Sequence, residues 1–217
     1  MKRIARVRES RLKSPTASVR DYSTRPTLFT QDRQPTEAYL AVPEVSSEHR
    51  RYIPIAFLTP AVVASNKLQI IVGGTIYHFG VLTSEMHMAW IRVVAGRLDS
   101  RFSYSPSVYN NYPWPEAATP AQRSAVETAA QRVLDARAAF PTSTLADLYD
   151  PLAMPPALAA AHAALDKAVD KCYRPDPVPT DRARVEHLFA LYERLTAPLA
   201  PSTKAPRKRA KAKGDRL

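Results

Sequence analysis

The sequence is poor in the residues that build cofactor and metal sites. A single cysteine among 217 residues excludes a disulfide framework and leaves no thiolate cluster for zinc. Five glycines offer little material for a phosphate-cradling loop, and neither GxGxxG nor GxxxxGKS/T occurs. The HExxH and GxSxG motifs of zinc proteases and serine hydrolases are also missing. No run of 18 apolar residues is present, so we expect no transmembrane helix.

The histidines and the cysteine are scattered rather than grouped. The five histidines stand at positions 49, 78, 87, 162 and 187. His162 and His187 lie within amphipathic patterns, where a core or boundary histidine is commoner than a catalytic one. His87 has Thr83 and Ile91 at helical spacing, and neither is a good metal ligand. The cysteine, at position 172, shares a helix face with a valine, which favours an inert buried thiol. We therefore predict no catalytic, cofactor-binding or metal site.

The net charge of +11 is concentrated at the two ends of the chain. Residues 1–20 hold seven Lys and Arg against one Glu, and residues 201–217 hold seven against one Asp, while the remaining 180 residues carry 17 basic and 18 acidic side chains. Basic arms bind polyphosphates by releasing counterions, with little sequence discrimination. The alternative for residues 201–217 is a solvated tail that aids solubility, and the N-terminal segment could be a strand or helix of a packed domain. That N-terminus lacks the apolar core of a secretory signal, so we expect a cytoplasmic protein.

The first half of the chain has a mixed pattern. Prolines at positions 15, 26, 35 and 43 break up residues 1–50, which we interpret as loops and short strands. Strands are predicted at Tyr39–Val42, Arg51–Leu58 (an edge strand, because of Pro54), Leu68–Val72 and Thr75–Leu82, the last two joined as a hairpin by Gly73-Gly74. A helix capped by Thr83 or Ser84 should follow and end at Gly96. Short extended pieces are expected at Arg101–Ser105 and Val108–Tyr112.

Alanine-rich helices dominate the second half. Thr119, Pro120 and Gln122 form a capping box that should start a helix ending near Phe140. Further helices are predicted at Pro156–Cys172 and Thr180–Thr196, with a short helical turn within Ser143–Asp150. The predicted fold class is α+β: a small mixed α/β domain over residues 1–115, an all-α helical bundle over 116–200 and a basic disordered tail over 201–217.

One short segment carries chemistry suited to recognition. Asp99 and Arg101 follow Gly96 two positions apart, so in an extended segment their side chains point the same way. They could simply pair with each other on the surface. They could also read a base pair, because Arg donates to guanine O6 and N7 while Asp accepts from the cytosine amine. Ser103 and Tyr104 supply a further donor and a flat face nearby.

Long stretches of the chain resemble a known family. They are YIPIAFLTP, IYHFGVLTSEMHMAWIRVVAGRLDSRFSYSPSVYNNYPWPE, LADLYDPLAMPPALAAAHAALDKAVDKCY and ARVEHLFALYERLTAPLA. From about Arg11 to Pro198 the chain is similar to the C-terminal part of MmeI-like adenine-N6 DNA methyltransferases, some of which are fused to a nuclease in type IIL restriction–modification enzymes. The resemblance implies a target recognition domain, N-terminally incomplete here, followed by a C-terminal helical domain.

The resemblance also implies what the chain does not do. The family's catalytic motif, NPPY or NPPF, does not occur, and NNYPWP at Asn110–Pro115 has Asn and Pro in a different order. The glycine-rich motif for S-adenosylmethionine is missing as well, so we expect this chain to bind no cofactor. The chain is then expected to be inactive in methyl transfer by itself.

In that family the two positions after the GRL tripeptide, at Asp99 and Arg101 here, vary with the recognised base pair. The resemblance thus implies DNA sequence recognition, with double-stranded DNA and a methyltransferase domain on a separate chain as partners. Candidate phosphate contacts are Arg50, Arg51, Lys67, Arg92, Arg97 and the basic ends. Two alternatives remain open: a non-catalytic module that binds DNA without sequence preference or docks on a methylase, and the product of a truncated gene.

Overall fold

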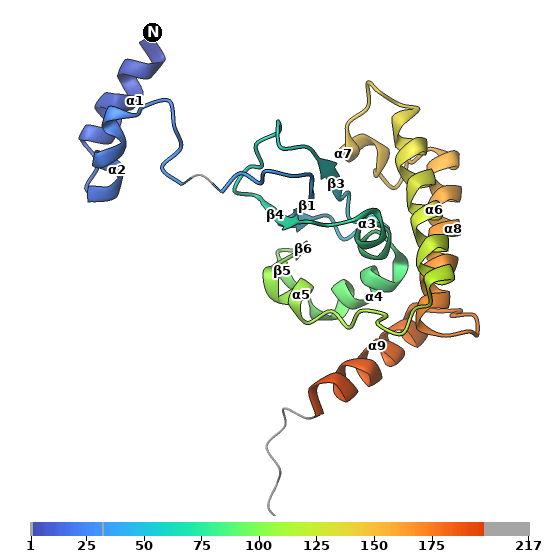
Figure 1. Ribbon diagram of the computed structural model, residues 1–217. Coiled ribbons are helices and arrows are strands. Elements are labelled where there is room, and N and C mark those ends of the chain that lie inside the picture. The colour runs from blue at the N-terminus through green and yellow to red at the C-terminus, as the bar shows by residue number, and fades with distance from the viewer. Residues whose placement is uncertain (1, 32, 198–217) are drawn as a thin grey trace, which may run out of the picture.

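A computed structural model describes residues 2–31 and 33–197 of the chain. A small N-terminal lobe stands apart from the main body (Figure 1). The lobe consists of α1 (Lys2–Leu12), α2 (Ala17–Asp21) and the 3-10 helix η1 (Tyr22–Thr24). The tail expected at residues 201–217 lies outside the described residues.

The helices of this lobe correct the expectation of loops and short strands in this part of the chain. The prolines that break the segment, Pro15 and Pro26, lie between or after the helices, so each helix fits in a proline-free stretch. Arg11 at the end of α1 donates from Nη1 to the carbonyls of Tyr22 and Arg25, at 3.0 and 2.7 Å. These hydrogen bonds join residues more than ten positions apart, so the periodicity of the sequence could not predict them.

The body contains two small antiparallel sheets. Their strands are β1 (Tyr39–Pro43), β2 (Val45–Ser46), β3 (Ala56–Leu58), β4 (Leu68–Val72), β5 (Gly96–Leu98) and β6 (Arg101–Ser103). The strand orders are β3-β1-β4 and β2-β6-β5. The strands predicted near positions 39 and 68 are confirmed, and the proline-containing run forms an edge strand only at its end, in β3. Glu44 joins the sheets: its N–H donates to the Lys67 carbonyl at 3.0 Å, and its carbonyl accepts from the Tyr104 N–H at 2.7 Å.

The predicted hairpin at Gly73-Gly74 is wrong. The run after it forms a helix, α3 (Ile76–Leu82), and β4 pairs with β1 instead. Thr75 caps α3 in a capping box with His78, a signal that the β-branched and aromatic composition of the run obscured. Gly80 lets α3 approach the helical region closely, because a Cβ there would lie 2.8 Å from a Val126 methyl and 3.3 Å from a Leu165 methyl. Tertiary packing therefore overrides the local strand propensity.

The next helix, α4 (Glu85–Val94), is capped by Ser84 as predicted. It leads directly into β5 through Ala95, which is extended, so Gly96 begins a strand rather than forming a left-handed stop. The extended piece predicted at Val108–Tyr112 is wrong, because α5 (Pro106–Asn110) occupies most of it. Ser105 precedes α5, and a proline at the first helical position suits a helix start.

Helices fill the second half of the chain, close to the predicted bounds. They are α6 (Pro120–Ala138), α7 (Leu145–Leu148), α8 (Pro156–Tyr173) and α9 (Asp181–Thr196). The Thr119 capping box is confirmed. Helices α6 and α8 lie side by side as an outer layer, and α3 packs against α6 from the inside (Figure 1). Helix α9 packs against α4, where Trp90 meets the rings of Phe189 and Tyr192 with centroids 5.4 and 5.8 Å apart. The sheets and helices therefore share one continuous core.

A buried carboxylate ties the helical region to the start of α4. Asp166, on α8, accepts from the Glu85 backbone N–H at 2.8 Å and from the Tyr52 hydroxyl at 2.7 Å. Burial raises the pKa of Asp166 to about 6. Glu85 itself pairs with Arg51 at 2.6 Å and with Arg92 at 3.0 Å. These contacts fix the N-terminal end of the helix that carries β5 at its other end.

A buried histidine holds the other side of α4. His87 Nδ1 lies 2.8 Å from the Leu82 carbonyl and Nε2 lies 3.3 Å from the Tyr104 hydroxyl. Burial lowers the pKa of His87 to about 4. The ring is therefore neutral at pH 7 and is part of the core.

Replacing Asp166 with Ala should destabilise the protein by about 3 kcal/mol, because the Glu85 N–H and the Tyr52 hydroxyl would be buried without a partner. Urea denaturation at pH 7 measures this loss. Asp176→Ala is the matched control: that carboxylate is 77% exposed and lies 3.7 Å from its arginine partner, so its loss should cost less than about 0.5 kcal/mol. Equal losses in the two variants would contradict the bridging role of Asp166.

Stability should fall below about pH 6.5 partly because of His87. Its folded-state pKa of about 4 is below its ordinary value of 6.5, so the unfolded chain takes up the proton first as the pH falls. The resulting loss between pH 6.5 and pH 4 is on the order of 3 kcal/mol. Urea denaturation at pH 7 and pH 4.5 should therefore show a smaller pH difference for His87→Gln than for the wild type. The same pH difference in both proteins would show that His87 does not titrate as proposed.

Candidate nucleic-acid interface

The candidate site is the hairpin of β5 and β6, which projects from the end of α4. Leu98 pairs with Arg101, so Asp99 and Ser100 form the loop between the strands. Asp99 has a φ of 54°, in the left-handed region that few residues other than Gly, Asn and Asp enter. All three residues of β5 are exposed, and β6 lies between β5 and β2. The hairpin therefore presents its tip to solvent.

Asp99 and Arg101 meet at this tip. Arg101 Nη2 donates to Asp99 Oδ2 at 3.1 Å, and the side chains of Arg101 and Asp99 are 49% and 82% exposed. An ion pair this exposed adds little to stability. Both side chains can exchange their mutual bond for a ligand at small cost. Ser103 follows on the same strand and is half-buried.

Tyr104 lies elsewhere than expected. Its side chain is 1% exposed, and its hydroxyl contacts His87 in the core. Burial raises the pKa of Tyr104, so the phenol stays protonated. Its ring is out of reach of a ligand at the hairpin tip. Continuing the alternation of β6 by one residue past Ser103 places Tyr104 on the same side as the buried Phe102, so the sequence pattern did hold a signal for its burial.

The five candidate cations for phosphate have three kinds of environment. Arg51 and Arg92 bind Glu85, and Arg92 also pairs with Asp181 at 2.6 Å. Lys67 and Arg50 make weaker contacts. Lys67 is exposed, and its Nζ lies 3.4 Å from Glu44 Oε2, while Arg50 donates to the Ala146 carbonyl at 3.5 Å. Arg97 is held within the hairpin region, where it pairs with Glu48. Sequence alone did not indicate Glu48, because its partner is 49 positions away.

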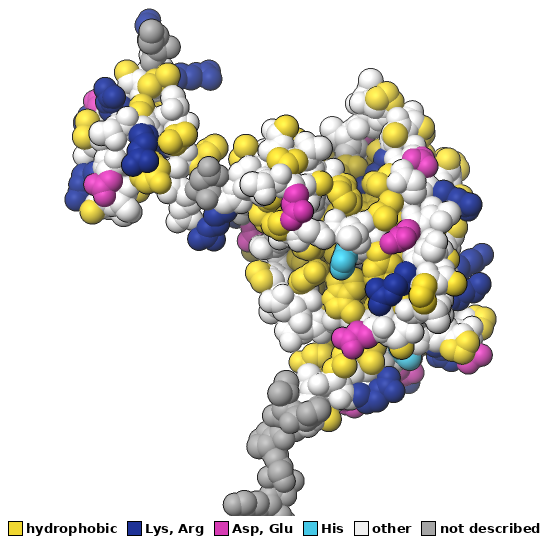
Figure 2. All heavy atoms as spheres, viewed as in Figure 1, with side chains coloured by type: hydrophobic (Ala, Val, Ile, Leu, Met, Phe, Trp, Pro, Cys, Tyr) yellow, Lys and Arg dark blue, Asp and Glu magenta, His cyan; other side chains and the backbone are white. Residues whose placement is uncertain are grey.

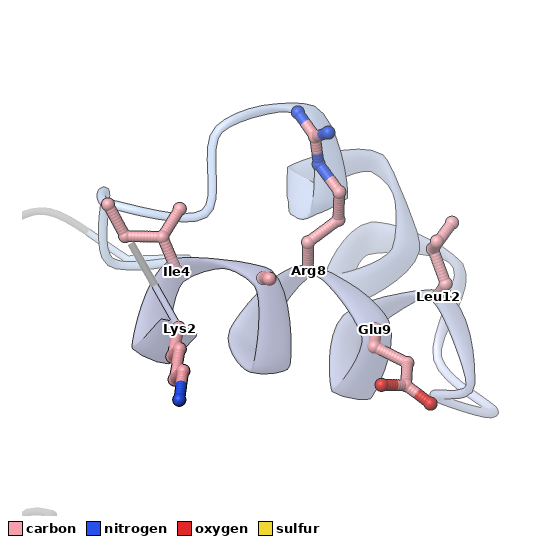
Figure 3. A pocket seen from close by; sticks show the side chains of 6 residues that line it. Lys2, Ile4, Arg8, Glu9 and Leu12 are labelled. Carbon is pink, nitrogen blue, oxygen red and sulfur yellow. The ribbon is translucent and has the colours of Figure 1, made fainter.

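The N-terminal lobe provides a second basic surface. Figure 2 shows Lys and Arg side chains on this lobe and, on the opposite side of the view, along the outer surface of α6 and α8. A shallow groove runs along α1 and is lined by Lys2, Ile4, Ala5, Arg8, Glu9 and Leu12 (Figure 3). Its lining combines the apolar side chains of Ile4, Ala5 and Leu12 with the charged side chains of Lys2, Arg8 and Glu9.

Residues 2–31 and 33–197 also lack two other features, a metal-binding cluster and a membrane-spanning helix. No group of three or more His, Cys, Asp or Glu side chains in these ranges is arranged to hold a metal ion. None of the described helices is both long and apolar enough to cross a membrane.

Comparison with known proteins identifies the family. The protein-family model described as "MmeI, target recognition domain" matches residues 1–116, more than half of the chain. The chain belongs to the MmeI family. The model "MmeI, C-terminal domain" matches residues 118–200, so the chain carries the MmeI target recognition and C-terminal domains together. The family resemblance inferred from the sequence is confirmed.

Two relatives of the MmeI family place the chain within longer proteins. "DNA methyltransferase A" of Bacillus subtilis (strain 168) is 36% identical over 195 residues, which are 89% of this chain and 22% of that protein. A solved structure, described as the type IIL restriction–modification enzyme MmeI in complex with DNA, is 43% identical with a TM-score of 0.80. The match covers 90% of this chain and 26% of that one. The chain thus spans about a quarter of the length of these relatives.

The left-handed conformation of Asp99 can be tested apart from any ligand. Asp99→Val should lower the free energy of unfolding by about 1–2 kcal/mol, because a β-branched side chain is strained at positive φ. Asp99→Gly should leave it within about 0.5 kcal/mol of the wild type. Urea denaturation compares the three proteins. If the Gly and Val variants were equally stable, the loop would not require the left-handed conformation.

Proposed function

We propose that this chain is the DNA-recognition part of a site-specific adenine-N6 DNA methyltransferase of the restriction–modification type. The observation that carries this function is the exposed pair of Asp99 and Arg101 on a projecting hairpin. Its membership of the MmeI family supports the same function, as does the likeness to a structure described as a DNA complex.

The hairpin suits the major groove of duplex DNA. That groove admits a two-stranded β-ribbon, and a G·C pair displays two acceptors on guanine beside a donor on cytosine. Arg101 can donate to the guanine acceptors while Asp99 accepts from the cytosine amine. Ser103 lies two residues from Arg101 on β6, so its hydroxyl faces the same side and can reach a neighbouring base or sugar.

Affinity would come from a different set of side chains. Lys67, Arg50 and the cations of the N-terminal lobe are placed to contact phosphates, which orient a protein on DNA without reading sequence. Arg51 and Arg92 are held by Glu85, so we assign them to the support of α4 instead.

Methyl transfer itself we assign to a methyltransferase domain outside these 217 residues. The chain contains neither the NPPY/NPPF motif nor a glycine-rich loop for S-adenosylmethionine, so its residues do not fit that cofactor. Double-stranded DNA and such a domain are therefore the proposed partners. A module that binds DNA without sequence preference is the second candidate, favoured by the basic N-terminal lobe.

Exchanging the charges of the pair tests the function directly. Asp99→Lys combined with Arg101→Asp should change the preferred base pair at one position of the bound site and leave the other positions unchanged. The measurement is selection of bound duplexes from a randomised library by the full chain, followed by sequencing. Lys67→Ala is the control and should weaken binding to all sequences, with the slope of log K against log salt smaller by about 0.9.

Two results would count against this function. Binding by the wild type with no sequence preference would support the sequence-blind module instead. An exchange variant that binds more weakly but selects the same sequences would remove Asp99 and Arg101 from the reading surface.

A further inference from the structure

The β5–β6 hairpin carries Asp99 and Arg101, called here the reading pair, and few contacts hold it in place. Each of its strands has three residues, and β5 is exposed along its length at the edge of its sheet. Short hairpins are marginally stable in water by themselves, and on its other side β6 pairs with the two residues of β2. Asp99 adds local strain through its positive φ. A reading pair on such a hairpin needs a contact that fixes the loop.

Arg97 makes contacts of the required kind. It pairs with Phe102 across the hairpin, and its guanidinium carbon lies 4.2 Å from the centre of the buried Phe102 ring. Its Nη1 donates to the Ser100 carbonyl, in the loop, at 3.0 Å. The same nitrogen lies 3.4 Å from Glu48 Oε2, just after β2. One planar group thus connects the loop, the neighbouring strand and the segment behind it.

These contacts favour a role for Arg97 other than the phosphate contact expected from the sequence. A phosphate contact needs a cation free to face the DNA backbone, whereas this guanidinium lies on an aromatic ring and beside a carboxylate that offsets its charge. Lysine could not replace it, because an ammonium has neither the planar face nor the forked donors.

We propose that Arg97 is a positioning residue for DNA recognition, held by Glu48, which fixes the loop so that Asp99 and Arg101 address one base pair together. This inference rests on the proposed function and assigns the residues that maintain its specificity. Arg97 touches no base and no phosphate in this role.

Two conservative variants of the full chain, Arg97→Lys and Glu48→Gln, separate positioning from phosphate binding. Each should reduce discrimination about fivefold or more at the single position governed by Asp99 and Arg101, as located by the charge-exchange variant. Discrimination at the other positions and the salt dependence of binding should stay as in the wild type. The readout is the same selection from a randomised duplex library, with affinities measured for the best duplex and its single-position variants.

A phosphate contact gives the opposite pattern. Glu48→Gln would then release a cation and tighten binding to all duplexes, with preferences unchanged. Arg97→Lys would keep both affinity and preference. Either pattern overturns the positioning role. A general loss of folding is recognised separately, because it weakens discrimination at all positions and lowers the free energy of unfolding in urea.

A second measurement needs no DNA. Hydrogen exchange of the amides of residues 98–103 should be about tenfold faster in Arg97→Lys than in the wild type, while the amides of β1 stay unchanged. Unchanged exchange in the hairpin overturns the inference. A wild-type chain without sequence preference overturns the proposed function and this inference together, whereas a preference that both variants retain in full overturns the inference alone.

Discussion

The position of helix α4 depends on one buried carboxylate from the helical region. Asp166 accepts the first free N–H of α4, at Glu85, and the hydroxyl of Tyr52. A helix start leaves its first N–H groups without partners, so a carboxylate there satisfies a donor and interacts favourably with the helix dipole. Because α4 continues into β5 without a loop, whatever fixes the helix start also fixes the direction of the hairpin. The C-terminal domain is therefore part of the support of the β5–β6 hairpin.

Sequence patterns predicted α4 and the helices of the second half of the chain, and missed α1, α2, α3 and α5. Capping residues predicted α4 and α6, because the side chains of Ser84 and Thr119 accept hydrogen bonds from backbone N–H groups three positions ahead. Helix α3 was missed because its Ile, Tyr, Phe and Val favour strands, and its glycine at position 80 is explained only by the close approach of α6 and α8. A local pattern cannot report a packing partner far along the chain.

The candidate site divides in the same way. The exposed pair at the hairpin tip could be expected from two side chains two positions apart, and the structure brings them within 3.1 Å of each other. The burial of Tyr104 follows the alternation that also buries Phe102, whereas the engagement of Arg51 with Glu85 could not be expected, because it depends on the three-dimensional neighbourhood of α4. A count of basic residues therefore overstates how many Lys and Arg side chains are available to bind phosphate, because some, such as Arg51 and Arg92, are paired with Glu85.

Exposure decides which charged pairs of this protein can vary. Arg184 and Asp170 are each 12% exposed, lie 2.7 Å apart and join α9 to α8, so loss of one partner would leave a nearly buried charge uncompensated. Asp99 and Arg101 are largely in water, so breaking their ion pair removes little stabilisation, and the positive φ of Asp99 is the constraint on which residue fits at that position. If Asp99 and Arg101 read a base pair as proposed, a hairpin fixed by other contacts can carry different residues at position 101, and at position 99 residues that accept a positive φ. Under that proposal, the contacts that hold the hairpin are distinct from the pair that reads DNA, so specificity can change with little loss of structure.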